Sequence, residues 1–242
     1  MQRKTSSTIA ALLAVAVLVT VAASPMGSQT GHFLTPQPSM LTPVMAGVTV
    51  TPILTVGDVL SSGYRFEAIP DGLAVRTIKR GQAEVFVNHE TSKVPFPYNS
   101  AAPTAANGEN DFDNAQISRL VLDTRSLSVL SGTFAIPSSA GFQRFCSSYL
   151  ATSREGFDRE ILFTNEETPD YVFRQEDSWP PPIGDPSEQE AGVVVALDVK
   201  NGKYYPIYGM GRHNHENSVP IPGFDQLVVL SGDEPPWTFW NA

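Results

Sequence analysis

The chain is poor in cysteine and in basic residues, and each shortage excludes something. Its one cysteine, Cys146, has no partner for an internal disulfide, so no disulfide framework holds the fold. Only 16 Lys and Arg residues stand against 25 Asp and Glu, which gives a net charge of −9. A chain of this charge is repelled by a phosphate backbone, which argues against nucleic-acid binding. Its charge favours multivalent cations as partners.

Outside its apolar N-terminal run, the sequence also lacks helix-length stretches with an apolar period of 3.6 residues. Its 20 prolines and 18 glycines are spread along the chain, and short runs rich in β-branched residues lie between them. We therefore expect an all-β protein of short strands joined by hairpins. The expected strands are 47–56, which Pro52 interrupts, 73–79, 83–88, 117–123, 127–136, 159–165, 192–199, 203–209 and 225–232.

The N-terminus has the pattern of a secretory signal peptide. Arg3 and Lys4 precede the uncharged run "IAALLAVAVLVTVAA", and small residues follow it. The run is shorter than the roughly 20 residues of a membrane-spanning helix, although an uncleaved anchor is the alternative. We expect a secreted or periplasmic protein without stable membrane insertion after cleavage. The expected parts are a signal peptide (1–24), a flexible leader (25–45) and a β domain (46–242).

Two polar, proline-rich inserts interrupt the strand pattern, at 95–116 and 175–192. Both are typical of long surface loops on a β scaffold. The first contains the acidic stretch "NGENDFDN" (107–114), which could suggest a calcium loop. That stretch lacks the residue order of an EF-hand, so a solvated loop is the preferred interpretation.

Three similar triplets are the most informative local pattern. Asn-His-Glu occurs at 88–90 and again at 214–216, and Asn-Glu-Glu lies between them at 165–167. The triplets are 77 and 49 residues apart, and a propeller blade takes about 40–50 residues. Equivalent positions on successive blades face one central channel, so we expect the triplets to meet there. The expected metal ligands are the carboxylates Glu90, Glu166, Glu167 and Glu216.

Clustered carboxylates repel one another unless a cation offsets their charge. Calcium suits such a cluster because it accepts 6–8 oxygen ligands. Cys146 would add a thiolate for a transition metal, but a buried structural cysteine is the alternative. Arg212, four residues before Glu216, is either a phosphate clamp or an ordinary ion-pair partner. The histidines are either ligands or groups that orient the glutamates.

These segments give the chain a family resemblance. It resembles the PhoX-type alkaline phosphatases and their secreted β-propeller relatives, in motifs that follow one another in the same order. The matching segments are "GYRFEAIPDGLAV" (63–75), "VFVNHET" (85–91), "ISRLVLD" (117–123), "FCSSYLATSREGFDREILFTNEET" (145–168) and a stretch at 192–219 that ends in "GRHNHENSV".

The resemblance implies a calcium-dependent phosphomonoesterase with a pair of irons in a six-bladed propeller. Cys146 would be the iron-bridging thiolate, Arg212 a phosphate contact, and Glu90, Glu167 and Glu216 metal ligands. Six blades need roughly 240–300 residues. We therefore expect an incomplete N-terminal portion of the propeller, with little phosphatase activity alone. The alternative function is that of a non-catalytic, calcium-stabilised propeller that binds a partner through surface loops.

Overall fold

The computed structural model describes residues 31–67, 69–92, 114–168, 171–172 and 189–233. Within these ranges the chain is all-β, as the sequence predicts, and its only helical segments are three short 3-10 turns. The expected signal peptide, most of both inserts and the acidic stretch 107–113 lie outside the described residues. No helix in the described ranges is long and apolar enough to span a membrane.

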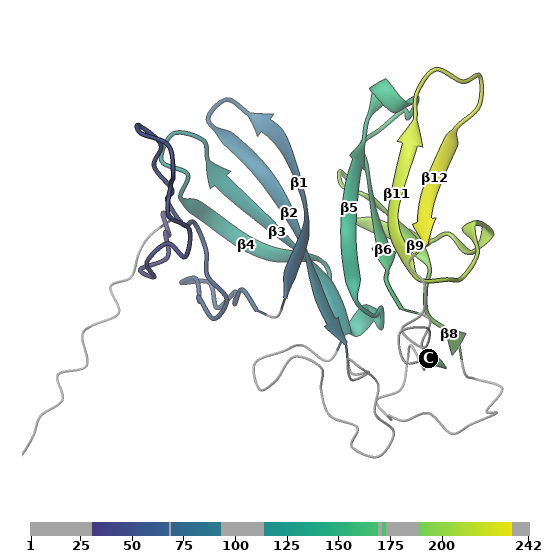
Figure 1. Cartoon of the computed structure of the whole chain (residues 1–242), viewed down its shortest axis with the longest axis horizontal. Helices are drawn as coiled ribbons and strands as arrows, with labels where there is room; N and C mark the ends of the chain where they lie inside the picture. The colour runs from purple at the N-terminus through teal and green to yellow at the C-terminus, as the bar shows by residue number, and fades with distance from the viewer. Residues whose placement is uncertain (1–30, 68, 93–113, 169–170, 173–188, 234–242) are drawn as a thin grey trace, which may run out of the picture.

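The strands form antiparallel sheets, of which two are four-stranded (Figure 1). Sheet 1 is a meander in chain order and sheet 2 has the order β10-β9-β6-β5, while sheet 3 is the pair β11-β12 and β7 pairs with β8. The strands are β1 (Pro70–Lys79), β2 (Gln82–Ser92), β3 (Asn114–Asp123), β4 (Val129–Ile136), β5 (Phe145–Ala151), β6 (Ile161–Glu166), β7 (Tyr171–Val172), β8 (Gln189–Glu190), β9 (Val194–Asp198), β10 (Lys203–Pro206), β11 (His215–Ile221) and β12 (Val228–Asp233). The 3-10 turns are η1 (Ser138–Ala140), η2 (Ser153–Glu155) and η3 (Tyr208–Met210).

Most of the expected strands correspond to observed ones. Residues 47–56 form no strand, and the main-chain groups of Val48, Ile53 and Thr55 bond to residues 45, 35 and 58, which lie outside the sheets. Four strands were not predicted, namely β5, β11 and the two-residue strands β7 and β8. The expected hairpin at Asn201-Gly202 is confirmed: it joins β9 to β10, and Gly202 has a φ of 71°, which only glycine adopts without strain.

Sheets 1 and 2 pack face to face. We call face A the side of a sheet that packs on the next sheet along the chain, and face B the opposite side. On face A of sheet 1, Phe86 and Ile117 are almost fully buried, and they join one core cluster with Phe145, Leu162 and Val195 of sheet 2. This apolar core fixes the two sheets against each other.

Sheet 3 packs on face A of sheet 2 in the same way. Its first strand, β11, contacts both β5 and β6. Ser218 and Pro220 of β11 are buried there. In Figure 1 the first strands of the three sheets, β1, β5 and β11, run in the same direction, and their N-terminal ends therefore lie at one end of the molecule.

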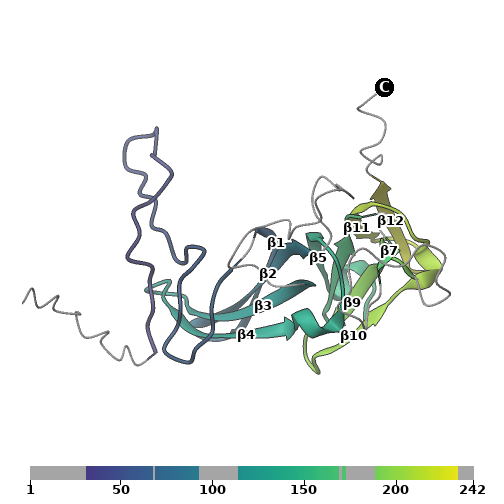
Figure 2. The same cartoon turned by 90° about the horizontal axis from the view of Figure 1, so that it is seen from below.

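Face B of sheet 1 is covered by the segment that precedes β1. Leu60, Tyr64 and Phe66 of this segment form a second core cluster with residues of β2, β3 and β4. Phe33 exchanges main-chain hydrogen bonds with Val129 at the edge of β4 (2.9 and 2.8 Å), so part of the expected leader is tied to the sheet. Figure 2 shows this segment beyond sheet 1, on the side away from β5.

Candidate metal centre

The first strands of the three sheets share one irregularity. In each of them a step of three residues is opposed by a step of only two on the second strand, which defines a β-bulge. The pairs that flank the bulge are Pro70–His89 and Leu73–Val87 in sheet 1, Phe145–Glu166 and Ser148–Thr164 in sheet 2, and His215–Asp233 and Ser218–Ser231 in sheet 3.

The bulges place a metal-binding type of side chain at the same position in all three sheets. The bulge residues are Asp71-Gly72, Cys146-Ser147 and Glu216-Asn217. A bulge turns a side chain away from the regular alternation of a strand, and bulges are common beside functional sites. The first bulge residue is therefore a carboxylate, a thiol and a carboxylate in successive sheets.

Two of these residues meet a third at one point. A ligand atom of each of Cys146, Glu167 and Glu216 lies within 4.8 Å of the other two. The Cys146 Sγ is 3.9 Å from Glu216 Oε1. Cys146 is 6 % exposed, whereas both glutamates are half-buried and so remain reachable from solvent. The three residues come from β5, from the position after β6 and from β11, far apart in the sequence.

The surroundings of Cys146 are strongly negative. Burial raises the pKa of the Cys146 thiol far above its usual range, and the carboxylates of Glu167, Asp71 and Glu216 raise it further. The thiol therefore keeps its proton at neutral pH. A bound cation would reverse this balance, because its charge offsets the carboxylates and a metal displaces a thiol proton.

Asp71 is the acidic group that the sequence did not single out. It is exposed on β1, and its charge acts on the Cys146 thiol from the bulge of sheet 1. In the sequence it belongs to "IPDG", which is typical of a turn. Its functional position becomes visible only when the three bulges are aligned.

Asn88 ties sheet 1 to the bulge of sheet 2. Its Nδ2 group lies 2.5 Å from Cys146 O, 3.0 Å from Ser147 O and 2.8 Å from Thr164 Oγ1, to which it donates hydrogen bonds. Gly72 lies beside the same bulge: a Cβ there would be 2.6 Å from Cys146 O. The bulges of β1 and β5 thus pack backbone to backbone, which only glycine allows at this position.

Sheets 2 and 3 are linked in a similar way, but through an intermediate serine hydroxyl. Ser147 occupies the bulge position of Gly72, and its hydroxyl donates to Glu216 O in the bulge of sheet 3. Asn165, the equivalent of Asn88, donates to Ser147 Oγ at 3.3 Å. Asn88, beside Gly72, bonds directly to the bulge of sheet 2. Asn165 instead bonds to the Ser147 hydroxyl, which in turn bonds to the bulge of sheet 3. Both links fix the backbone that carries a candidate ligand.

Not all of the predicted site residues lie at this point. Glu166 is fully buried, and its two carboxylate oxygens accept the main-chain N–H groups of Gln143 (2.9 Å) and Val193 (3.0 Å). Glu90 is half-buried and does not belong to the group of three. The guanidinium of Arg212 lies over the Tyr208 ring, 4.8 Å from its centre.

Both histidines of the triplets are fully buried inside the protein. His89 Nδ1 donates to Glu67 O at 2.6 Å, and Nε2 accepts from Ser118 Oγ at 2.6 Å. Burial lowers the pKa of His89 to about 4, although the bond to the Glu67 carbonyl opposes this shift. His215 Nδ1 bonds to Ser231 Oγ at 2.6 Å. Each ring thus fastens strands, and neither belongs to the cluster of candidate ligands.

The expectation that all three triplets hold equivalent positions is wrong. Residues 88–90 and 165–167 do correspond, since both lie on the second strand of a sheet, opposite the start of the bulge in the first strand. Residues 214–216 instead enter the first strand of sheet 3, where His215 pairs with Asp233. The reason is the register: the bulge, not the tripeptide, determines which residue faces the site. The sequence position in sheet 3 that corresponds to Glu167 is Glu234, outside the described residues.

No protein-family model, no curated protein and no solved structure matches this chain. Its function therefore has to be inferred from the geometry of the cluster and from the sequence motifs.

Proposed function

We propose that the sheets are successive blades of a β-propeller and that the chain binds metal ions where the first strands begin. Two consecutive four-stranded sheets, stacked face to face with their first strands adjacent, are typical of propeller blades. The equivalent bulges of the three sheets support the same interpretation, because they show one structural unit repeated along the chain.

The observation that carries the metal site is the convergence of Cys146, Glu167 and Glu216 within 4.8 Å. A thiolate with carboxylates is a donor set that suits iron, because the sulfur favours a transition metal and the oxygens accept a harder ion. The nearby carboxylate of Asp71 adds an oxygen donor that suits calcium. Cys146 and Glu216 are fixed through their main-chain carbonyls, so their positions are set before any ion arrives.

For the reaction we propose hydrolysis of phosphate monoesters by an exported protein, which rests on the resemblance to the PhoX-type phosphatases. A metal at the cluster would polarise a phosphoryl oxygen and activate a water molecule. Glu167 and Glu216 would hold the ion at the solvent-facing side of the buried thiol. Arg212 would contact the phosphate, with its guanidinium positioned by the Tyr208 ring.

The test is metal loading of the purified chain after treatment with a chelator. We expect iron and calcium each to raise the melting temperature, because a ligand that binds only the folded state stabilises it. Elemental analysis should find iron in the wild type and not in Cys146→Ser. The matched control is Asp225→Asn, which removes an acidic charge from the exposed β11–β12 loop and should bind metal normally.

Absence of any metal effect on melting and composition would refute the site. A phosphomonoester assay on the loaded protein separates the two functions. Turnover that depends on Cys146 supports the enzyme, whereas metal-dependent stability without turnover supports the non-catalytic propeller.

A further inference from the structure

Among the residues that the structure describes, two sheet faces lack the cover that their equivalents have. Face A of sheet 1 is covered by sheet 2, and face A of sheet 2 is covered by sheet 3. The first strands β5 and β11 use their face B for this packing. Two surfaces of the same kinds remain without cover in the described part of the chain. One is the side of sheet 3 that faces away from sheet 2, which is its face A, and the other is face B of β1.

Equivalent residues show how different the uncovered face A is. Phe86 and Phe163 each lie two residues before the linking asparagine of their sheet, and they are 1 % and 3 % exposed. The bulge register makes Leu230 their equivalent in sheet 3, where it pairs with Val219. Leu230 is 61 % exposed. An apolar side chain thus stands at the position that is filled and buried in both preceding sheets.

The opposite end of the chain shows the complementary surface. Counted from the first bulge residue, the third and fifth residues of β5 and β11 face the preceding sheet. In β11 these residues are Ser218 and Pro220, and both are buried there. Their equivalents in β1 are Leu73 and Val75, which are 65 % and 62 % exposed. Apolar side chains therefore replace the polar or small residues of β11 at a place where the described residues provide no cover.

We propose that a second copy of this chain docks on these surfaces, head to tail. Face B of β1 in one copy, with Leu73 and Val75, would pack on Leu230 of face A in the other copy. It would resemble the contacts that first strands make internally, where β5 packs on β1–β2 and β11 packs on β5–β6. Only β1 is available for it, because the segment before β1 covers the rest of face B of sheet 1. Each copy carries both halves of the interface, so one copy can supply the surface that the other lacks.

Such an interface is heterologous, because the two surfaces that meet are different. Heterologous contacts close into a ring if the rotation between copies allows it and otherwise extend into a chain of copies. The docking is independent of the metal site, because its residues lie on the strand faces and not in the bulges.

The test is the mass of the purified chain in solution, measured by light scattering and by sedimentation over a hundredfold range of concentration. We expect a dimer or larger assembly for the wild type. Leu230→Asp and Val75→Asp should each weaken association at least tenfold, because each would bury an unpaired charge. Leu41→Asp is the matched control: Leu41 is 71 % exposed and belongs to neither surface, so this variant should associate normally.

A mixing experiment makes the test specific for a head-to-tail contact. Leu230→Asp retains an intact β1 surface and Val75→Asp retains an intact sheet 3 surface. An equimolar mixture should therefore form a one-to-one dimer, while each variant alone stays monomeric. Circular dichroism spectra like that of the wild type would show that the exposed substitutions preserve the fold. A wild-type monomer at every concentration, or an assembly unaffected by both substitutions, would overturn the proposal.

Discussion

The two Asn-His-Glu tripeptides have the same sequence but different structural roles. In the first, Asn88 links two sheets through three hydrogen bonds, and in the second the side-chain amide of Asn214 has no hydrogen-bond partner among the described residues. Glu90 lies in the second strand of sheet 1 and outside the cluster of candidate ligands, whereas Glu216 lies in the bulge of β11 and belongs to the cluster. Strand register, and not local sequence, therefore assigns these side chains their roles.

The largest expected effect concerns the close contact between the bulges of β1 and β5, next to the hydrogen bonds of Asn88. Gly72→Ala should cost about 3 kcal/mol of unfolding free energy, because its Cβ would lie 2.6 Å from main-chain atoms of β5 that cannot move aside. Urea unfolding measures this loss. The matched control is Gly209→Ala, where the new methyl group would meet open space. Equal stabilities of the two variants would show that β1 and β5 are not in contact at their bulges.

The next effect compares the two asparagines directly. Asn88→Ala should destabilise the protein by about 2 kcal/mol, because it leaves the Cys146 and Ser147 carbonyls without their donor. Asn214→Ala should cost less than about 1 kcal/mol, since no hydrogen bond in the described part of the chain is lost. Both are measured by urea unfolding at neutral pH. The different roles of the tripeptides would be disproved by a larger loss for Asn214→Ala.

The smallest of the three stability effects is pH-dependent and concerns His89. Its pKa is about 4 in the folded protein and near 6.5 when unfolded, so below pH 6.5 the unfolded state binds more protons. His89 should therefore lower the stability by roughly 1–2 kcal/mol as the pH falls from 7 to 5. His89→Gln should flatten that part of the stability profile.

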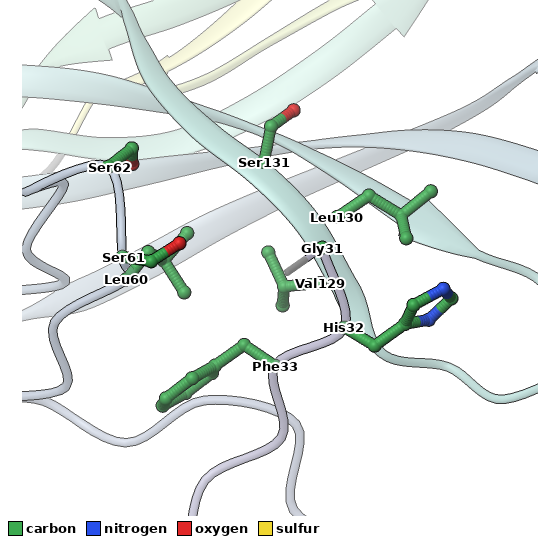
Figure 3. Close-up of a pocket in the computed structure, with 9 residues that line it drawn as sticks. All are labelled: Gly31, His32, Phe33, Leu60, Ser61, Ser62, Val129, Leu130 and Ser131. Atoms are coloured by element: carbon green, nitrogen blue, oxygen red, sulfur yellow. The ribbon is translucent and has the colours of Figure 1, made fainter. Parts of the chain in front are cut away.

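The matched control for His89 is His32→Gln, which replaces an exposed histidine at the edge of β4 (Figure 3). His32 bonds to Ser128 Oγ at 2.7 Å, so this variant measures how much of any change in the profile comes from the loss of one histidine hydrogen bond. A His89→Gln profile as steep as that of the wild type would contradict the buried, neutral state of His89.

The sequence predicted the all-β class and most of the longer strands, because β2, β3, β6 and β9 each contain a short run rich in apolar and β-branched residues near turn residues. It did not predict β5 and β11, which read "FCSSYLA" and "HENSVPI". These strands use buried hydrogen bonds as well as apolar contacts, so they lack the alternation that identifies a strand. A bulge near the start of each strand disturbs the period further.

The same strands limit what could be predicted of the site. Glu167 and Glu216 were named from residue type and spacing, and Cys146 was named as a ligand from the family resemblance; the structure brings the three together. Glu166, one residue from Glu167, was also named, but the alternation of β6 turns it inward to main-chain donors. Asp71 was missed because its role depends on a bulge register that no single segment displays.

The central claim is that Glu216, and not Glu90 of the identical tripeptide, shares a metal site with Cys146. The most direct measurement is a Co²⁺ titration of the chelator-treated protein, followed by the thiolate-to-metal charge-transfer absorption that only a Cys146-bound ion can produce. The band should appear in the wild type and in Glu90→Gln and should be absent in Cys146→Ser. In Glu216→Gln the apparent affinity for Co²⁺ should fall at least tenfold. A normal band in Glu216→Gln together with a lost band in Glu90→Gln would contradict the account.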